Sequence, residues 1–468
     1  MLNISYRVTP VLLIILFLCP LLLGQNDIMN RQERWRFLAP SAPVSDDPRR
    51  MPVPPSPHGP PGTLVLVGGR IFDGLGSESR AGTLVIERNK ILQILPPGVK
   101  NWPDTARVID VTGKTVMPGL IDLHTHITYP GAHDSDAVAE SMSDATLRGV
   151  EHLRYYIESG ITSVRDVGSN GDAPFRLKVW IQQNRIRGPR IFAAGQMITG
   201  TGGHGDEGGL SFNLVSNDPV TGRHYLASGA DGWREAVRQQ FKRGADLIKI
   251  ASHFSRAEVT AAVEEAHALG LKVTCDCETF YIQWAVEAGV DMIEHPLPRT
   301  DDTIRLMAGQ HTEEDPTLVS YMMIFDRSGG YYDTPSRRFT FSKEANVELV
   351  AKMRNAGIKM GIGTDLVSDS YQYLPWAYIT ELKQFVKAGY SIPNTLEIAT
   401  RINAELLDMS DKLGTLEPGK LADVIVVDGR PDLRLDDLAK LTLVIRDGYI
   451  QVEDRQLHAP VHSPLPMQ

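Results

Sequence analysis

The stretch that decides the fold reads Val116-Met117-Pro118-Gly119-Leu120-Ile121-Asp122-Leu123-His124-Thr125-His126. Its apolar residues predict a buried strand that ends in two histidines one residue apart. Because side chains alternate between the two faces of a strand, His124 and His126 point to the same side. Two imidazoles on one face supply half of a metal site, whereas an isolated His-x-His pair is more often two surface histidines in a turn. The rest of the chain decides between these interpretations.

Apolar strands alternate with amphipathic stretches over the middle of the chain. After the opening strand, the predicted strands cover residues 161–167, 190–194, 247–250, 271–275, 291–294, 316–320 and 358–362. The clearest predicted helices cover residues 136–158, 257–269, 281–288 and 343–355. Several helices end on a glycine just before the next strand, which is typical of helix C-termini. Eight strand-then-helix units predict an α/β protein with a closed (β/α)8 TIM barrel, which carries its active site at the C-terminal ends of the strands.

Short β segments flank this barrel at both ends of the chain. One set lies in residues 62–117 and the other in residues 412–458, and neither set has enough strands to bury its own faces. We therefore expect both sets to combine into one small β-sandwich domain beside the barrel of residues 118–411. Residues 25–61 are rich in Pro, Ser and Arg, which predicts a disordered linker, and residues 459–468 form a tail.

Residues 1–24 have the composition of a secretory signal peptide. A short polar start is followed by an apolar run over residues 11–23 and by the small residue Gly24 at a cut point. We predict export to the periplasm or the cell exterior, with an uncleaved membrane anchor as the alternative. Removal of the signal leaves Cys275 and Cys277, which lie one residue apart on a predicted strand. We expect no ordinary disulfide between them.

The composition of the chain is that of a globular protein and not of a nucleic-acid-binding one. Of its 468 residues, 42% are hydrophobic and 22% are charged. A formal net charge of -9 offers no basic surface for phosphates, which argues against nucleic acid as a partner. We expect a small-molecule or short-peptide substrate and no stable membrane partner beyond the signal segment. The sequence is compatible with a homo-oligomer.

Ionisable side chains recur at the C-terminal ends of the predicted barrel strands. Lys249 closes the fourth strand between two isoleucines, His295 closes the sixth and Asp365 closes the eighth. A buried lysine is rare without a partner. Each residue alone has an ordinary explanation, since Lys249 can reach solvent, His295 can cap a helix and Asp365 can begin a turn. Their shared position at strand ends favours one joint site together with the two imidazoles.

With these motifs in place, the sequence resembles the metal-dependent amidohydrolase superfamily, in particular the branch of imidazolonepropionase-like hydrolases and Xaa-Pro dipeptidases. The resemblance runs from about Thr63 to Gln451. It rests on residues 118–126 and 244–250, on Ile293-Glu294-His295 and Gly363-Thr364-Asp365, and on residues 414–423. It implies a divalent metal cofactor of one or two ions, with zinc as the expected metal and manganese or another harder ion as the alternative.

The resemblance also implies a role for each candidate. His124 and His126 bind one ion, and His295 binds the second. Lys249 carries a carboxyl group that bridges the two ions, and Asp365 binds metal and accepts the proton of the attacking water. The implied reaction is hydrolysis of an amide or peptide C–N bond by a metal-activated hydroxide, in an Xaa-Pro dipeptide, an acyl-amino acid or a cyclic amide. An esterase or lactonase is the alternative, because the same hydroxide attacks either carbonyl.

One position departs from the pattern of such relatives, in which the fifth strand ends in a histidine. This chain has Asp276 there and Glu278 two residues later. By strand alternation both acids face the bore, whereas Cys275 and Cys277 face the helices as packing residues. Asp276 either binds the second ion, which would suit a harder ion such as manganese, or the second ion is lost. A degenerate barrel that binds a small molecule or peptide without turnover is the rival that Asp276 supports.

Three further residues are candidates for substrate binding. His204 lies in Gly202-Gly203-His204-Gly205, which matches an element that borders the substrate pocket in similar enzymes, although loop flexibility explains these glycines equally well. Tyr321 and Arg337 lie in the segment 321–341 after the predicted seventh strand. That segment is either a lid that pairs with a substrate carboxylate through arginine or a solvated surface loop.

Overall fold

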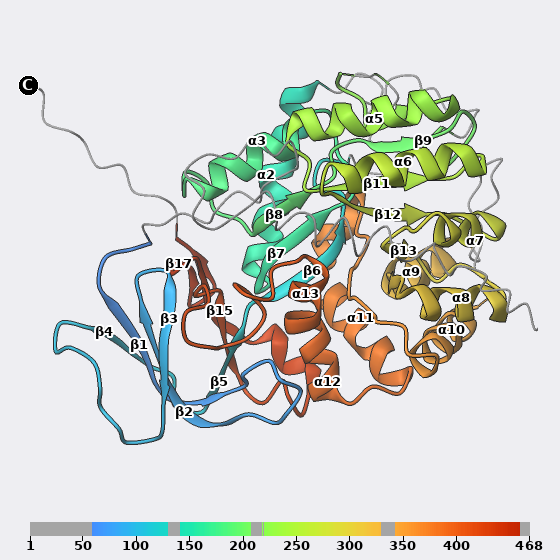
Figure 1. The fold of residues 1–468 in the computed structure, drawn as a ribbon. Helices are drawn as coiled ribbons and strands as arrows, with labels where there is room; N and C mark the ends of the chain where they lie inside the picture. The colour runs from blue at the N-terminus through green and yellow to red at the C-terminus, as the bar shows by residue number, and fades with distance from the viewer. Residues whose placement is uncertain (1–58, 130–140, 207–217, 219, 329–341, 459–468) are drawn as a thin grey trace, which may run out of the picture. The chain divides into compact units, whose positions relative to one another are not determined.

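The computed structural model describes residues 59–129, 141–206, 218, 220–328 and 342–458 (Figure 1). The predicted signal peptide, residues 25–58 of the predicted linker, the C-terminal tail and Arg337 all lie outside these ranges. Within the described part of the chain, every helix is too short or too polar to cross a membrane.

Strands from the two ends of the chain form one sheet of nine strands. The N-terminal strands are β1 (Thr63–Ile71), β2 (Arg80–Glu87), β3 (Lys90–Leu95), β4 (Arg107–Asp110) and β5 (Lys114–Pro118). The C-terminal strands are β15 (Val424–Asp428), β16 (Leu441–Arg446), β17 (Tyr449–Glu453) and β18 (Gln456–Leu457). The two groups join at the antiparallel pair of β5 and β15, where Met117 lies opposite Ile425. The β-rich domain is thus one hydrogen-bonded sheet with an apolar core of its own, which includes Leu66, Val116 and Val424.

Two parallel sheets make up the middle of the chain. The smaller contains β6 (Leu120–Thr125), β7 (Ile161–Asp166) and β8 (Arg190–Ala193) in that order. The larger runs in the order β10 (His224–Leu226), β9 (Met197–Thr199), β11 (Leu247–Ala251), β12 (Lys272–Asp276), β13 (Met292–Glu294) and β14 (Glu313–Asp315). The short strands β9 and β10 are additions to the predicted set. The protein is therefore an α/β protein with parallel strands.

Helices alternate with these strands and pack outside them, as α5, α6 and α7 do in Figure 1. The α-helices are α2 (Met142–Glu158), α3 (Ala173–Gln182), α5 (Gly229–Arg243), α6 (Arg256–Ala268), α7 (Phe280–Glu287), α8 (Asp301–Gln310), α9 (Leu318–Ser328), α10 (Lys343–Asn355), α11 (Trp376–Lys387), α12 (Ile392–Glu397) and α13 (Asn403–Leu406). Shorter helical segments are η2 (Ser368–Tyr373), η3 (Ile398–Ile402) and η4 (Leu435–Ala439). The ends of α6 show how sequence sets such bounds, because Ser255 and Glu258 form a capping box and Gly270 follows with a φ of 72°.

The predicted strand at residues 316–320 is wrong. The structure has β14 at Glu313–Asp315 instead, and α9 begins at Leu318. The apolar residues that suggested a strand lie in the first turn of α9, whose Leu318 and Val319 N–H groups donate to the Glu381 carboxylate. The predicted eighth strand is reduced to an isolated parallel bridge between Met360 and Glu314. A second isolated bridge joins Leu366 to Thr125 of β6.

The expectation that Cys275 and Cys277 do not pair is also wrong, because the structure links them by a disulfide. The expectation assumed that both residues lie on one extended strand, but β12 ends at Asp276. The chain turns there and brings the two Cα atoms to 5.6 Å, within the range that a disulfide spans. Both cysteines are fully buried in the apolar core.

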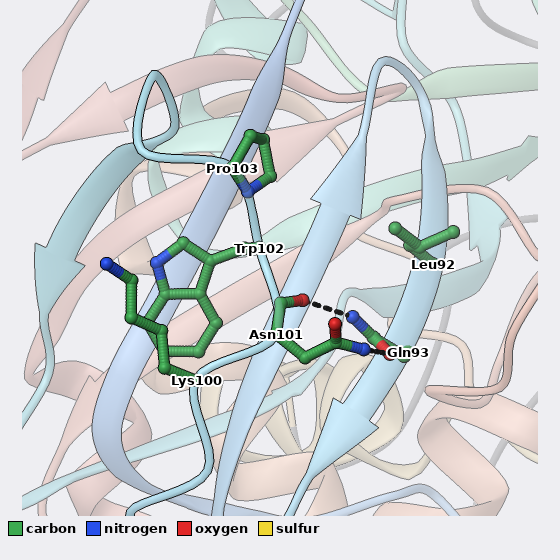
Figure 2. Close-up of a pocket in the computed structure, with 6 residues that line it drawn as sticks. All are labelled: Leu92, Gln93, Lys100, Asn101, Trp102 and Pro103. Carbon is green, nitrogen blue, oxygen red and sulfur yellow. Dashed lines mark hydrogen bonds between the residues drawn. The ribbon is translucent and has the colours of Figure 1, made fainter.

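A pocket of about 520 Å³ lies in the β-rich domain (Figure 2), lined by Leu92, Gln93, Lys100, Asn101, Trp102 and Pro103. Hydrogen bonds close one side of it: Gln93 Nε2 donates to the Asn101 carbonyl at 2.7 Å, and Asn101 Nδ2 donates to Gln93 Oε1 at 3.0 Å. All its lining residues come from β3 and the loop that follows. The pocket therefore contains no candidate metal ligand.

Candidate metal centre

The structure brings the six predicted metal-site residues into one connected cluster. His124 lies on β6 and His126 directly after it, Lys249 lies on β11 and Asp276 on β12. His295 directly follows β13, and Asp365 lies in the segment after the Met360 bridge. All are buried except Asp365, which is partly accessible. Residues up to 241 positions apart in the chain thus meet where the parallel strands end.

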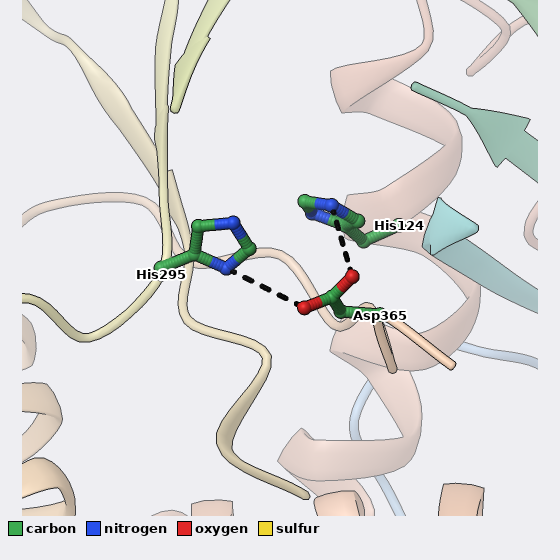
Figure 3. A group of neighbouring side chains, drawn as sticks. All are labelled: His124, His295 and Asp365. Carbon is green, nitrogen blue, oxygen red and sulfur yellow. Dashed lines mark ion pairs between the residues drawn. The ribbon is translucent and has the colours of Figure 1, made fainter. Parts of the chain in front are cut away.

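Asp365 stands at the centre of the first half of the cluster. Its Oδ1 lies 3.5 Å from His124 Nε2 and 3.3 Å from His126 Nε2, while its Oδ2 lies 3.9 Å from His295 Nδ1. Figure 3 shows the carboxylate between the rings of His124 and His295. Ligand atoms of His124, His295 and Asp365 all lie within 4.8 Å of one another, a spacing that suits one metal ion.

Hydrogen bonds on the far side of two rings decide which nitrogens face Asp365. His124 Nδ1 lies 2.8 Å from Glu294 Oε2, and His126 Nδ1 lies 2.9 Å from the Gly168 carbonyl oxygen. Because both partners are acceptors, Nδ1 of each ring carries a hydrogen, and in the neutral form of a ring the Nε2 lone pair is directed at the carboxylate. Imidazole nitrogens and a carboxylate oxygen that face one another are ligand atoms of divalent ions, so these residues fit a divalent metal.

Electrostatics keep these groups in the protonation states that bind metal. Burial, together with the nearby Lys249 ammonium, lowers the pKa of His124 to about 3, so this imidazole is neutral at pH 7. Burial alone would raise the pKa of the Asp365 carboxyl, but at the acid pH where this carboxyl titrates His124 is protonated as well, and the charge of that imidazolium outweighs burial and holds the pKa of Asp365 well below its usual range. A neutral imidazole and an ionised carboxylate are the forms that ligate divalent ions.

The backbone at two of these positions is in the left-handed region. His295 has a φ of 73° and Asp365 a φ of 50°. Non-glycine residues adopt such angles at a cost, and they concentrate at functional sites. The Asp365 N–H donates to the His124 carbonyl at 2.8 Å, and Ser320 Oγ donates to the Asp365 carbonyl at 2.6 Å. These bonds hold Asp365 beside the imidazoles despite the unfavourable angle.

Asp276 stands at the centre of the second half of the cluster. Its Oδ2 lies 3.1 Å from His295 Nε2, 3.5 Å from Lys249 Nζ and 3.6 Å from His204 Nε2. His295 Nδ1 is also held at 2.8 Å from Thr317 Oγ1. Lys249 Nζ is fully buried and makes no hydrogen bond to any residue that the structure describes. The Asp276 carboxylate therefore lies among the nitrogens of His295, Lys249 and His204.

The three candidates for substrate binding have different outcomes. His204 lies beside Asp276, and its N–H donates to the Ser252 carbonyl at 2.7 Å, which ties its loop to the end of β11. Tyr321 lies in α9 and not in a loop; it is buried, with its ring centroid 5.3 Å from that of His295. Arg337 lies outside the described residues. Tyr321 therefore packs against His295 of the cluster. The role of Arg337 stays a prediction.

Several buried charged residues beside the cluster were missed by the sequence reasoning. Glu294 contacts His124, Arg165 pairs with Glu294 and Asp315, and Asp122 accepts hydrogen bonds from the His124 and Thr364 N–H groups at 3.1 Å and 2.9 Å. One signal was available, because Glu294 and Asp122 are ionisable residues inside apolar strands, as Lys249 is. Applying the same rule to acids would have found both.

Comparison with known proteins identifies the family. The model of the amidohydrolase family matches residues 115–451. The chain belongs to the amidohydrolase family. It is accordingly a hydrolase that acts on carbon–nitrogen bonds, in a family that typically depends on divalent metal.

Individual relatives of this amidohydrolase span most of its length. Ochratoxinase from Aspergillus niger is 25% identical over 421 residues, which cover 83% of this chain and 86% of that protein. The solved structure of an amidohydrolase is 31% identical with a TM-score of 0.73, covering 84% of this chain and 99% of the other. A prolidase complexed with N-methylphosphonate-L-proline is 28% identical with a TM-score of 0.73, covering 84% and 100%. These neighbours imply a TIM barrel with a β-rich domain.

Proposed function

We propose that this amidohydrolase cleaves the amide bond of a small substrate with the help of a divalent metal, and that Xaa-Pro dipeptides, acyl-amino acids and cyclic amides are its candidate substrate classes. The observation that carries the proposal is the convergence of His124 Nε2 and His126 Nε2 on Asp365 Oδ1. The likeness to a prolidase complexed with a proline phosphonate supports the dipeptide class.

His124, His126 and Asp365 are the proposed ligands of the first ion, and His295 with Asp276 and Lys249 those of a second. Zinc suits the imidazole-rich first half, whereas the carboxylate of Asp276 favours a harder ion such as manganese in the second. When bound there, a divalent ion makes water a nucleophile near neutral pH and polarises a carbonyl. We propose that Lys249 is carboxylated when two ions are bound, because its buried Nζ has no hydrogen-bond partner among the described residues.

Asp365 is the proposed proton carrier. Its two oxygens face different parts of the cluster, Oδ1 toward His124 and His126 and Oδ2 toward His295. An ionised carboxylate in that position can take the proton of the attacking water and give it to the departing nitrogen. An amine leaves only after it is protonated, whereas an activated ester needs no such help. Dependence on Asp365 therefore separates the amide reaction from the alternative, an esterase or lactonase.

We also propose that the two parallel sheets close into a single (β/α)8 barrel beside a β-sandwich. Three hydrogen bonds support closure: from Asp246 N to Ala193 O at 2.8 Å, from Gly361 N to Glu314 O at 2.7 Å, and from Leu123 N to Ile362 O at 3.1 Å. The first bond joins β8 to the residue before β11, and the other two join β14 and β6 to the segment 361–362 that lies between them. A closed barrel places all the strand ends around one mouth, as the metal cluster requires.

Residues 1–24 are proposed to direct export to the periplasm or the cell exterior, where the chain would act on a small molecule or short peptide, alone or as a homo-oligomer. The apolar run over residues 11–23 supports this proposal. Cell fractionation of the full-length chain and N-terminal sequencing of the mature protein test it. Cytoplasmic protein with an intact N-terminus would contradict export.

The experiment for the activity combines metal analysis with a substrate panel. Purified protein is analysed for zinc and manganese, stripped with a chelator, and assayed with Xaa-Pro dipeptides, acyl-amino acids, cyclic amides and matched esters and lactones. We expect bound metal, amide hydrolysis that is lost on stripping, and recovery on adding metal back. Hydrolysis of esters alone would favour the esterase. Full activity of metal-free protein, or metal-loaded protein that hydrolyses none of the panel, would overturn the proposal.

A further inference from the structure

A buried carboxylate, Glu294, lies directly behind the imidazole of His124. Glu294 Oε2 is 2.8 Å from His124 Nδ1, and Glu294 Oε1 accepts from Arg165 Nη2 at 2.7 Å and from Thr274 Oγ1. Glu294 has no exposed surface, and Arg165 and Thr274 are buried beside it. Each of these residues comes from a different strand, since His124 is on β6, Arg165 on β7, Thr274 on β12 and Glu294 on β13.

Arg165 holds Glu294 in place through several contacts of its own guanidinium. Its Nε donates to the Leu123 carbonyl, next to His124, and its Nη2 also lies 3.3 Å from Asp315 Oδ2. The ligand atoms of His124, Glu294 and Asp315 lie close enough together to suggest a second metal site. The guanidinium already supplies the cation at that point, because Nη2 contacts both carboxylates. This group of acids therefore serves the imidazole and is not itself a metal site.

The contacts of Glu294 restrict the state of the His124 ring. A carboxylate paired with arginine is ionised and can only accept hydrogen bonds, so the His124 nitrogen that faces it must carry hydrogen. A neutral imidazole has one N–H, which leaves Nε2 bare and directed at Asp365 Oδ1, 3.5 Å away. We propose that Glu294, anchored by Arg165, is a positioning residue that fixes the tautomer and orientation in which His124 Nε2 binds the metal ion.

The test measures metal affinity in the variant Glu294→Gln, which keeps the shape of the side chain and removes its charge. Co²⁺ is the probe, with affinity measured by competition with a chelator and coordination followed by the visible absorption of the bound ion. We expect Co²⁺ binding to weaken about 10- to 100-fold, because the amide no longer enforces hydrogen on Nδ1.

The matched control is Asp246→Asn, which removes the charge of another buried ion pair. Asp246 pairs with Lys178 at 2.7 Å just before the first residue of β11, away from the cluster. We expect its Co²⁺ affinity to stay within about twofold of wild type, although metal-free protein of either variant unfolds at a lower temperature. Equal affinity in Glu294→Gln and wild type, or equal weakening in both variants, would overturn the inference.

A second measurement keeps the inference testable should Glu294→Gln not fold. Nitrogen NMR of metal-free wild-type protein with labelled histidines reports which ring nitrogen of His124 carries hydrogen, with His124→Gln identifying the signal. Hydrogen on Nδ1 supports the proposal, and hydrogen on Nε2 contradicts it. The inference rests on the proposed metal dependence, yet the two fail differently. If wild-type protein binds no Co²⁺, the proposed function is wrong. If the variant binds Co²⁺ as tightly as wild type, only the role of Glu294 is wrong.

Discussion

At the scale of single residues, the identity of the atom that faces the metal cluster decides what the cluster can hold. Asp276 puts an anionic oxygen at the end of β12, where the resemblance predicts an imidazole nitrogen, and that oxygen lies within 3.6 Å of His295, Lys249 and His204 nitrogens. If Asp276 is a ligand as proposed, its negative charge would make a metal bound there a weaker Lewis acid and would favour hard ions. Substitution at this one position should therefore change metal preference before it changes the fold.

Replacing Asp276 with histidine is expected to shift metal preference from manganese toward zinc and to change the rate of amide hydrolysis. The physical reason is the exchange of a hard oxygen ligand for an imidazole nitrogen. Metal content after growth with equal zinc and manganese, together with kcat, measures the effect. Unchanged stoichiometry and unchanged rate would show that Asp276 is not a ligand.

Replacing Asp365 with asparagine tests the proton carrier. We expect kcat on amide substrates to fall by roughly 10²- to 10⁴-fold, the usual contribution of a positioned acid–base group. Loss on an activated ester should be smaller, since its leaving group needs no proton. Steady-state assays on a matched amide and ester measure the difference. Equal losses on both substrates would assign Asp365 to metal binding alone.

At the scale of elements, buried acids explain why β14 was missed. Its sequence, Glu313-Glu314-Asp315, is not apolar, yet Glu314 and Asp315 are fully buried, because burial raises the pKa of both carboxyls and each has an arginine partner. Arg299 makes a bidentate pair with Glu314, and Arg165 pairs with Asp315. A strand can thus be buried without an apolar pattern when its charges find partners elsewhere in the chain.

Breaking the pair of Arg299 and Glu314 should be costly because neither side chain has any exposed surface. We expect Arg299→Met to lower the free energy of unfolding by about 1 to 3 kcal/mol, since burial raises the pKa of Glu314 to about 7 and the variant leaves this buried carboxyl group without its hydrogen-bond partner. The double variant with Glu314→Leu should recover much of that loss. Denaturant unfolding of both single variants and the double variant measures the coupling. A double variant as unstable as Arg299→Met would contradict this account.

The contact between His267 of α6 and Asp291, the residue before β13, should make the free energy of unfolding depend on pH. His267 Nε2 lies 2.9 Å from Asp291 Oδ2, and the Val273 N–H donates to the same oxygen at 2.8 Å. Burial alone would raise the pKa of Asp291, but the hydrogen bond from His267 and its charge outweigh it and lower that pKa below 3.8. As the pH falls, the Asp291 carboxylate of the unfolded chain is therefore protonated at a higher pH than that of the folded protein. The contribution of Asp291 to the free energy of unfolding is complete above the pKa of the unfolded chain and is lost as the pH falls through the lower pKa of the folded protein.

Asp291→Asn should accordingly lower the free energy of unfolding at pH 7 by about 1 to 3 kcal/mol. It should also flatten the loss of stability toward acid pH, because the titrating group is gone. Thermal unfolding at a series of pH values tests both effects, with Asp302→Asn as an exposed control. If the variant loses stability toward acid pH as steeply as wild type does, Asp291 does not have this role.

At the scale of the whole molecule, the β-rich domain and the parallel sheets depend on each other. β5 runs through Gly119 directly into β6, and β5 takes its antiparallel partner β15 from the other end of the chain. The Gly119 N–H donates to the Asp423 carbonyl at 2.9 Å, and Arg190 of β8 pairs with the Asp423 carboxylate at 3.4 Å. The strand that carries His124 and leads directly into His126 is thus anchored by the C-terminal segment.

Deleting residues 424–458 should therefore prevent folding of the metal-binding part as well. The deletion removes the partner of β5 and exposes the apolar core around Val116. Expression of the truncated chain, with solubility and Co²⁺ binding as readouts, tests the expectation. A soluble fragment that unfolds cooperatively and binds Co²⁺ would show that the parallel sheets fold alone.

Local patterns in the sequence determined the alternation of strands and helices and the position of His124, Lys249 and His295 on or directly after strands. Such features are set by periodicity over a few residues, so they can be predicted from the sequence without the tertiary structure. Only the tertiary structure decided which atoms face one another: Glu294 behind His124, the disulfide of Cys275 and Cys277, and the burial of acidic β14. The position of Glu294 and the burial of β14 depend on partners far away in the chain, such as Arg165, 129 residues before Glu294, whereas the disulfide depends on where β12 ends. A buried charge or a turned strand end is stable only through contacts that local pattern does not encode.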